Sequence, residues 1–223
     1  MFADKALQNR DRMLLWVVNL LAISGLVSYA MIVEKNGFWR HDSWIYKSSV
    51  FSQFKYDGRW LEPFIHPYLQ HWPPFLAWLI SVACLWFFGY RMAKRLLPIT
   101  EPGHVWLATA TGSVLIFIPG LLGNLEWPIN VMATAFVLAL TAYYIDIRRG
   151  FLIASAGTLA IGGLLQAFLP FTLLFFLPEC QTLNELSHRN FHLLMLRRLC
   201  FWIVVVLSSL LFIKALQFTW FGH

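Results

Sequence analysis

The segment FLIASAGTLAIGGLLQAFLPFTLLFFL, residues 151–177, contains no charged side chain. A helix needs about 20 residues to cross the hydrocarbon core of a bilayer, so this segment is long for a single crossing. Gln166 and Pro170 also interrupt its apolar character, and proline ends or kinks a helix. The segment therefore forms either one long membrane helix or two short ones that turn near Gln166.

The basic residues that follow favour the second arrangement. Arg189, Arg197 and Arg198 come shortly after the segment, and basic residues beside membrane helices tend to stay in the cytoplasm. A single crossing would place them outside, whereas a tight pair of helices keeps them inside. Each half spans only about 21 Å at 1.5 Å per residue, which is short for a bilayer. We nevertheless predict two helices, 151–165 and 167–177.

The rest of the chain has the same membrane character. Hydrophobic residues make up 59% of the sequence and charged residues 13%, whereas a soluble domain has about 25% charged residues. The apolar blocks are continuous and do not alternate, which favours helices over a barrel. We predict an all-α polytopic transmembrane helical bundle, in a single integral membrane domain (1–223), with about seven segments. These are 13–33, 72–97, 105–118, 128–144, 151–165, 167–177 and 199–217.

The same charge rule predicts the orientation. The first apolar block could be a signal peptide, since Ser28 and Ala30 are small residues at cleavage spacing, but it is longer than a signal core. We expect a retained span with a cytoplasmic N-terminus, and we expect the loop 34–72 outside, with an interfacial helix after Asp42. The basic residues at the end of the second span belong inside, namely Arg91, Lys94 and Arg95.

Several functions are disfavoured by the sequence. The net charge is +6, but the basic residues are divided among short loops, so we expect no nucleic acid partner. Cys84, Cys180 and Cys200 have no CxxC spacing and are expected to be free thiols. His66 and His71 are weak evidence for a metal site, and we predict no dedicated one. Phosphate-binding loops and serine nucleophile motifs are absent.

The loop 34–72 contains the candidate catalytic carboxylates. Asp42 fits two roles: it can cap the interfacial helix, or it can act at the lip of a cavity as a general base or hold a divalent metal such as Mg²⁺. Asp57 precedes Gly58, and this pair is typical of a turn, so Asp57 ranks second.

Other charged residues in the outside loops are candidates for binding. Arg40 and Arg59 could hold phosphate oxygens, because the guanidinium group suits bidentate contact. The alternative for each is an anchor at the membrane surface. Glu126 lies in the second outside loop and could reach the same face, or it is a solvated loop residue.

These motifs resemble a known family. Asp42 lies in RHDSW soon after the first span, Gly58 and Arg59 lie in YDGRW, and Gln166 lies in LLQAFLPF, residues 164–171. In this order they are similar to motifs of the polytopic glucosyltransferases that modify bacterial O-antigen, which are C-type membrane glycosyltransferases. Leu165 stands where that family commonly has tyrosine, and His41 stands where it often has a second aspartate.

The resemblance implies an activity and a location. The protein would lie in the bacterial inner membrane. On its periplasmic side, a sugar, expected to be glucose, would pass with inversion from a polyprenyl-phosphate carrier to a cell-surface glycan. Asp42 would deprotonate the acceptor, and Arg40 or Arg59 would offset charge on the leaving phosphate. Trp44 and Trp60 would stack on sugar rings, although tryptophan beside a membrane is often an anchor.

The length of the chain leaves alternatives open. With 223 residues it is about half as long as the usual member of that family. This length fits a half-length or truncated member, a degenerate copy, or one chain of an enzyme that a partner chain completes. The alternative functions are a noncatalytic membrane subunit and a transporter of lipid-linked sugar. Because transporters usually carry charges or broken helices at mid-membrane, and few polar residues lie there, the enzyme is favoured.

Overall fold

The computed structural model describes residues 58–69, 71–96, 128–145, 150–178 and 188–221, and part of a helix between residues 13 and 31. Every regular element in these ranges is a helix, which confirms the all-α prediction. The number of membrane segments stays a prediction. The described elements are α4 (Glu62–Leu69), α5 (Pro74–Leu96), α8 (Pro128–Tyr144), α9 (Gly150–Leu164), the 3₁₀ helix η1 (Gln166–Thr172), α10 (Leu173–Phe176) and α12 (His188–Phe221).

Two of these helices are long and apolar enough to cross a membrane, judged by length and composition alone. They cover Phe75–Leu96 in α5 and Asn190–Phe221 in α12. Helix α5 begins at Pro74, directly after Pro73, and a missing N–H costs little there because the first turn of a helix has no acceptor for it. The predicted span 105–118 lies outside the described ranges.

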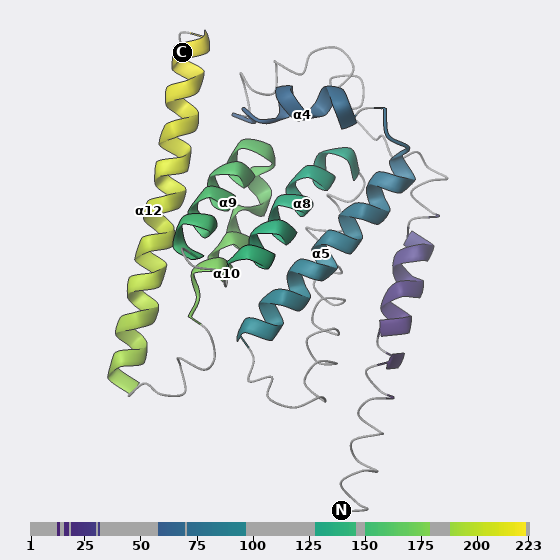
Figure 1. Ribbon diagram of the computed structural model, residues 1–223, viewed down its shortest axis with the longest axis horizontal. Helices are drawn as coiled ribbons and strands as arrows, with labels where there is room; N and C mark the ends of the chain where they lie inside the picture. Colours follow the sequence, from purple (N-terminus) through teal and green to yellow (C-terminus); the bar gives the residue numbers. More distant parts are fainter. Residues whose placement is uncertain are drawn as a thin grey trace, which may run out of the picture.

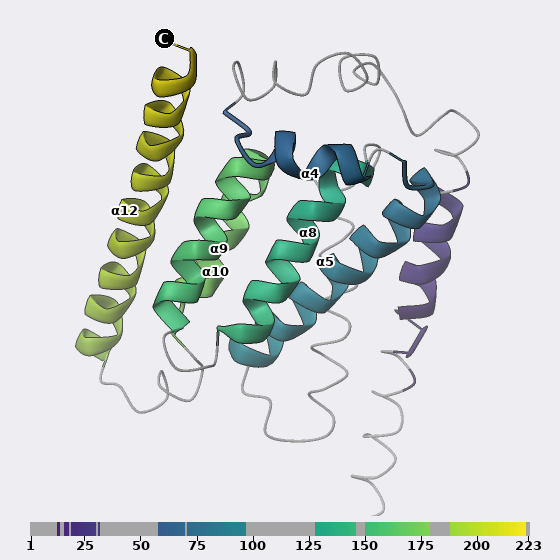
Figure 2. The same ribbon diagram turned by 45° about the horizontal axis from the view of Figure 1, so that its top comes forward.

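Helices α5, α8, α9 and α12 lie side by side in this order (Figures 1 and 2). Helices α5 and α8 run in the same direction. Ala77 packs with Met132 near their N-termini, and the Arg91 guanidinium lies 5.7 Å from the Tyr143 ring centroid near their C-termini. This direction is consistent with a further span between them. Helix α9 runs the opposite way, and Gly157 lies against Thr141 of α8.

The segment 151–177 reverses direction near Gln166. Helix α9 ends at Leu164, and Leu165 is extended, with φ −136° and ψ 99°. The chain then returns through η1 and α10, so that the rings of Phe151 and Phe176 lie 6.3 Å apart. Pro170 lies within η1, where its lack of an N–H suits a short 3₁₀ helix better than a long α-helix. That both α9 and the returning segment of η1 and α10 cross a membrane stays a prediction.

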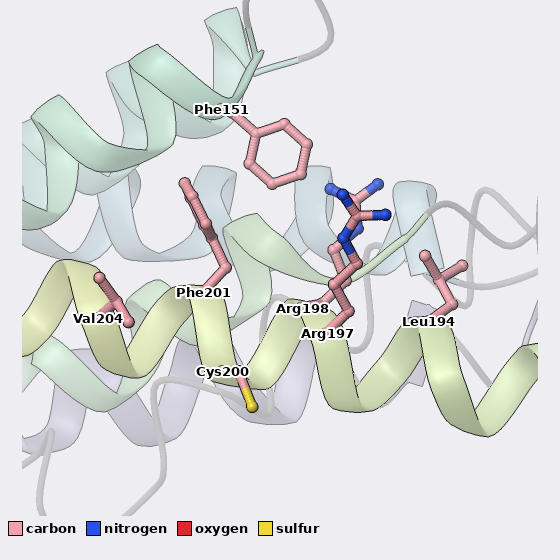
Figure 3. A pocket seen from close by; sticks show the side chains of 7 residues that line it. All are labelled: Phe151, Leu194, Arg197, Arg198, Cys200, Phe201 and Val204. Atoms are coloured by element: carbon pink, nitrogen blue, oxygen red, sulfur yellow. The ribbon is translucent and has the colours of Figure 1, made fainter.

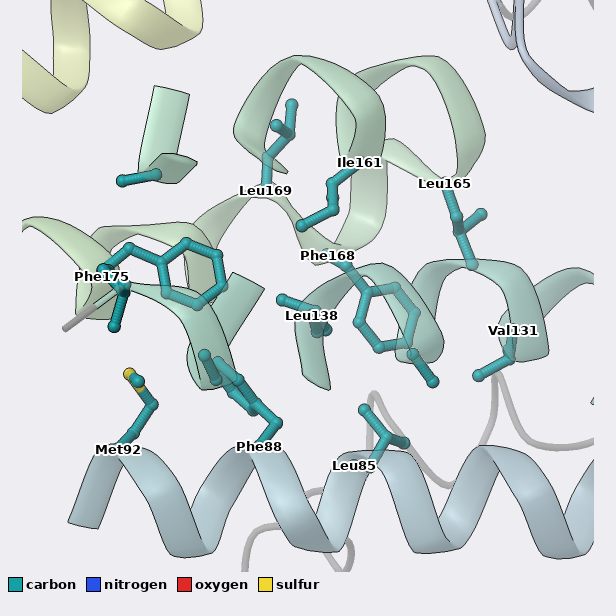
Figure 4. Packing of buried hydrophobic residues seen from close by; sticks show 14 of the residues in the cluster. Leu85, Phe88, Met92, Val131, Leu138, Ile161, Leu165, Phe168, Leu169 and Phe175 are labelled. Carbon is teal, nitrogen blue, oxygen red and sulfur yellow. The ribbon is translucent and has the colours of Figure 1, made fainter. Parts of the chain in front are cut away.

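The core lies between α5, α8 and the α9–α10 hairpin (Figure 4). Phe88 of α5 is fully buried and meets the Phe175 ring edge-on at 5.7 Å. Such edge-to-face pairs add about 1 kcal/mol beyond the burial of their area. Leu138 of α8 and Phe168 of η1 are also fully buried in this cluster. The core thereby fixes the hairpin against α5 and α8.

Helix α12 is longer than the predicted span 199–217. It begins at His188, includes Arg197 and Arg198, and its 34 residues extend for about 51 Å at 1.5 Å per residue. The predicted span 199–217 lies within this helix, and which part of the helix crosses a membrane stays a prediction. A helix can continue through charged residues once it leaves the hydrocarbon core, since its backbone hydrogen bonds stay internal.

One end of the bundle is rich in basic residues. Arg198 of α12 lies close enough to Arg95 of α5 for their charges to interact. Lys94 is in the same last turn of α5, so this end is basic. The opposite end carries the segment 58–61, the turn at Leu165 and α4, which lies across it (Figures 1 and 2).

Helix α4 was not anticipated. Its residues, which include His66 and Pro67, fall in the stretch 34–72 that the sequence analysis assigned to an outside loop. Glu62 lies in the first turn, where a carboxylate favours a helix by its interaction with the helix dipole. Pro67 lies inside this short helix.

Candidate functional site

A tight turn at Gly58 begins the candidate site. Its φ is +72°, a conformation that is costly for residues with a Cβ, and the Trp60 N–H donates to the Gly58 oxygen at 2.9 Å. A Cβ at Gly58 would also lie 2.5 Å from Ile213 Cγ2 on α12. Glycine is thus required here both for the backbone and for the close approach of α12. The positive φ expected of this glycine is present, while Asp57 lies outside the described ranges.

The segment 58–61 is attached to the C-terminal end of α9. The Leu61 N–H donates to the Gly163 oxygen at 3.0 Å. The last carbonyls of a helix have no donor within the helix, so this bond satisfies one of them. The attachment sets the position of Arg59 relative to the turn at Leu165.

Trp60 holds the same segment between α9 and α12. A methyl group at Gly163 would collide with the Trp60 indole, which shows how closely the ring packs on α9. On its other side the indole meets the Phe212 ring edge-on at 5.6 Å. Among the described residues, no acceptor bonds to Trp60 Nε1, and this atom is buried. In the structure Trp60 is a packing residue beside the site, and its stacking on a sugar stays a prediction.

Arg59 is paired with a buried carboxylate. Its Nη1 lies 3.5 Å from Glu62 Oε1, and the two side chains are 17% and 7% exposed. A carboxylate buried to this degree is costly without a cation, so Arg59 compensates Glu62. The pair also holds the guanidinium group at the edge of the cavity described next.

A cavity of about 600 Å³ opens between the turn at Gly58, the turn at Leu165 and α12. This volume falls in the range of small-molecule sites. A Cβ at Gly58 would lie 3.2 Å from Gln166 Nε2 and 3.5 Å from Gln217 Nε2, so both side-chain amides converge there. The lining residues are Gly58, Arg59, Leu165, Gln166, Ala167, Leu210, Ile213, Lys214 and Gln217.

The chemistry of this lining suits an anion attached to an apolar group. Arg59 and Lys214 supply positive charge. The planar guanidinium group of Arg59 fits two phosphate oxygens, and the ammonium group of Lys214 is flexible. Gln166 and Gln217 can donate to and accept from hydroxyl groups, while leucine and isoleucine form the apolar wall. No carboxylate is among the described residues of the lining. Within the described ranges no three His, Cys, Asp or Glu residues gather as metal ligands.

Comparison with known protein families, with curated protein sequences and with solved structures finds no match. The resemblance to the O-antigen glucosyltransferases therefore stays a prediction that depends on the short motifs around Asp42, Gly58–Arg59 and Gln166.

The structure brings together two of the predicted site residues and places a third beside them. Arg59 and Gln166, which are far apart in the sequence, line the same cavity, and Trp60 packs next to it. The other predicted site residues lie outside the described ranges, namely Arg40, Asp42, Trp44, Asp57 and Glu126.

Sequence reasoning missed the contribution of α12. Leu210, Ile213, Lys214 and Gln217 are spaced by three, one and three residues, which places them on one helix face. A lone charge within an apolar helix is a functional candidate by default, so Lys214 was a signal that could have been used. The buried Glu62 was also missed, and nothing in its sequence context distinguishes it from a solvated loop residue.

Proposed function

We propose that this chain is an integral membrane glycosyltransferase that moves a sugar, expected to be glucose, from a polyprenyl-phosphate carrier to a cell-surface glycan such as O-antigen. One observation carries the proposal: Arg59 and Gln166, predicted from two separate motifs, line one cavity with Lys214. This lining matches the three parts of such a donor. Its phosphate would lie beside the cations, its sugar beside the amides and its isoprenoid chain beside the apolar residues.

The charge distribution supports a location at the outer surface of a bacterial inner membrane. The cavity lies at the end opposite Arg95 and Arg198, and basic residues favour the cytoplasmic side. A glycan acceptor would reach the cavity from the periplasm, while the carrier would enter from the bilayer.

In the proposed reaction the acceptor oxygen bonds to the anomeric carbon as the bond from that carbon to the phosphate oxygen breaks. The acceptor proton passes to Asp42, which acts as the general base. Polyprenyl phosphate leaves with the electron pair of the broken bond, and Arg59 and Lys214 stabilise its negative charge. Asp57 is the second candidate base, and a divalent metal such as Mg²⁺ is compatible with either carboxylate.

A second candidate is a noncatalytic subunit or transporter that binds the lipid-linked sugar without transferring it. Binding without transfer needs only the cations and amides of the described lining, namely Arg59, Lys214, Gln166 and Gln217. Binding alone requires Arg59 and Lys214 but does not require Asp42 as a base. Binding and transfer therefore have to be measured separately.

The test uses the purified full chain in vesicles with a polyprenyl-phosphate glucose donor and a glycan acceptor. Lys214→Gln is expected to weaken donor binding about tenfold or more, because a hydrogen bond to a charged group contributes about 1.5–3 kcal/mol. Lys94→Gln, an exposed lysine at the opposite end, is the matched control and should bind normally. Asp42→Asn should bind the donor and lose transfer.

The outcomes separate the candidates. Normal donor binding by Lys214→Gln would contradict the proposal that the donor binds in this cavity. Retained transfer by Asp42→Asn would remove the assigned base. Donor binding by the wild-type chain with no transfer, alone or with a partner chain, would favour the noncatalytic subunit.

A further inference from the structure

A second cavity lies at the basic end of the molecule, between the start of α9 and the N-terminal half of α12 (Figure 3). Its volume is about 630 Å³. Phe151 forms one wall, and Leu194, Phe201 and Val204 of α12 form the other. This second cavity is separate from the one beside Arg59 and shares no residue with it.

The second cavity has an excess of positive charge. Arg197 and Arg198 line it, and Arg198 also lies within electrostatic range of Arg95. Within the described ranges, no carboxylate forms an ion pair with Arg197 or Arg198. Like charges this close repel each other, so an anion bound between them would stabilise the arrangement.

The aromatic residues hold one guanidinium group beside the apolar wall. Arg198 Cζ lies 4.2 Å from the centroid of the Phe151 ring, within the range of a cation–π contact. The Phe151 ring meets Phe201 edge-on at 5.2 Å, and Phe201 also contacts Phe176 of the hairpin. Figure 3 shows the guanidinium groups of Arg197 and Arg198 on the side of α12 that faces Phe151.

The apolar wall is open at its surface. The side chains of Phe151, Phe201 and Val204 are 42%, 41% and 57% exposed, although all three are apolar. An occupant that fits both features has an anionic head and a long apolar chain. Basic pockets between membrane helices on the cytoplasmic side have this composition and bind anionic lipid head groups.

We propose that this cavity binds an anionic phospholipid of the cytoplasmic leaflet, with its phosphate between Arg197 and Arg198 and an acyl chain along Phe151, Phe201 and Val204. The inference depends on the proposed membrane location but not on sugar transfer. It assigns the two cavities to different lipids at opposite surfaces.

The test measures lipid binding by the purified full chain with native mass spectrometry. Phosphatidylglycerol is compared with phosphatidylcholine of the same acyl chains, and glycerol phosphate tests the head group alone. Phosphatidylglycerol should bind in preference. Arg198→Gln should weaken its binding about fivefold, since one basic residue near an anionic surface contributes on this scale. Lys94→Gln removes one charge at the same end without touching the cavity and should have less effect.

Val204→Trp tests the apolar wall without changing the charge. The larger side chain would fill the groove at an exposed position and should weaken phosphatidylglycerol binding while the helix content stays normal. As a check that needs no variant, phosphatidylglycerol should raise the Tm of the wild-type chain more than phosphatidylcholine does. The proposal would be overturned by equal affinity for the two lipids, by an equal effect of Lys94→Gln, or by glycerol phosphate binding as well as the lipid.

Discussion

Arg59 has two tasks in this molecule. It lines the cavity beside Gly58, and it lies 3.5 Å from Glu62, whose side chain is 7% exposed. The pairing restricts the guanidinium group to one position, so a ligand phosphate would meet a donor that is already oriented. The same pairing makes the fold depend on Arg59, because Glu62 is buried beneath it.

Replacing Arg59 by glutamine is expected to lower the free energy of unfolding by about 3 kcal/mol, since it removes the cation that pairs with the buried Glu62 carboxylate. Chemical unfolding of the purified chain in detergent micelles measures this change. The double variant Arg59→Gln with Glu62→Gln should recover most of the loss, because both partners are then neutral. An equally unstable double variant would mean that the ion pair is not the cause.

Helix α9 carries two adjacent glycines with different surroundings. A Cβ at Gly163 would collide with the Trp60 indole. A Cβ at Gly162 would come no closer than 3.6 Å to Ile213 and 3.7 Å to Leu169, which are ordinary contacts. Only Gly163 is therefore needed for the segment 58–61 to lie against the end of α9.

Alanine at these two positions should separate packing from helix propensity. Gly163→Ala is expected to cost about 1–3 kcal/mol, as overpacking does in other cores, and to weaken donor binding because Arg59 is displaced with Trp60. Gly162→Ala should be neutral or stabilise the chain by up to about 1 kcal/mol, because alanine favours a helix. Thermal unfolding and donor binding of the two variants check this. Equal stability and equal donor binding of the two variants would contradict the view that the contact between Trp60 and Gly163 positions Arg59.

The sequence predicted those features that depend on residues close together in the chain. Gln166 and Pro170 interrupt an uncharged segment, and the chain does reverse at Leu165. Gly58 follows an aspartate, and it does have a positive φ. The position of Lys214 in the cavity depends instead on how α12 packs against α9, which no local pattern contains. Likewise the burial of Glu62 follows from the tertiary contacts around Arg59.

At the scale of the whole molecule, the two ends carry different features. One end gathers Arg95, Arg197 and Arg198, and the other carries α4 and the cavity beside Arg59. In the proposed orientation the first end faces the cytoplasm and the second faces the periplasm.

Single cysteines placed at the two ends test this orientation. In a chain whose three native cysteines are replaced, Tyr68→Cys on α4 should react with a membrane-impermeant maleimide in intact spheroplasts, because Tyr68 is 76% exposed. Lys94→Cys should react only after the membrane is permeabilised. The reverse labelling pattern would place the candidate site in the cytoplasm, where the glycan acceptor is not expected.

Helix α12 contributes a wall to both cavities: Leu194 to Val204 at the basic end, and Leu210 to Gln217 at the other. It is continuous between them and contains no proline, which is a common cause of helix kinks. Helix α12 packs along one side against α9 and α10, so a change in its tilt would alter the width of both openings. Occupancy at one leaflet would then be mechanically linked to access at the opposite leaflet.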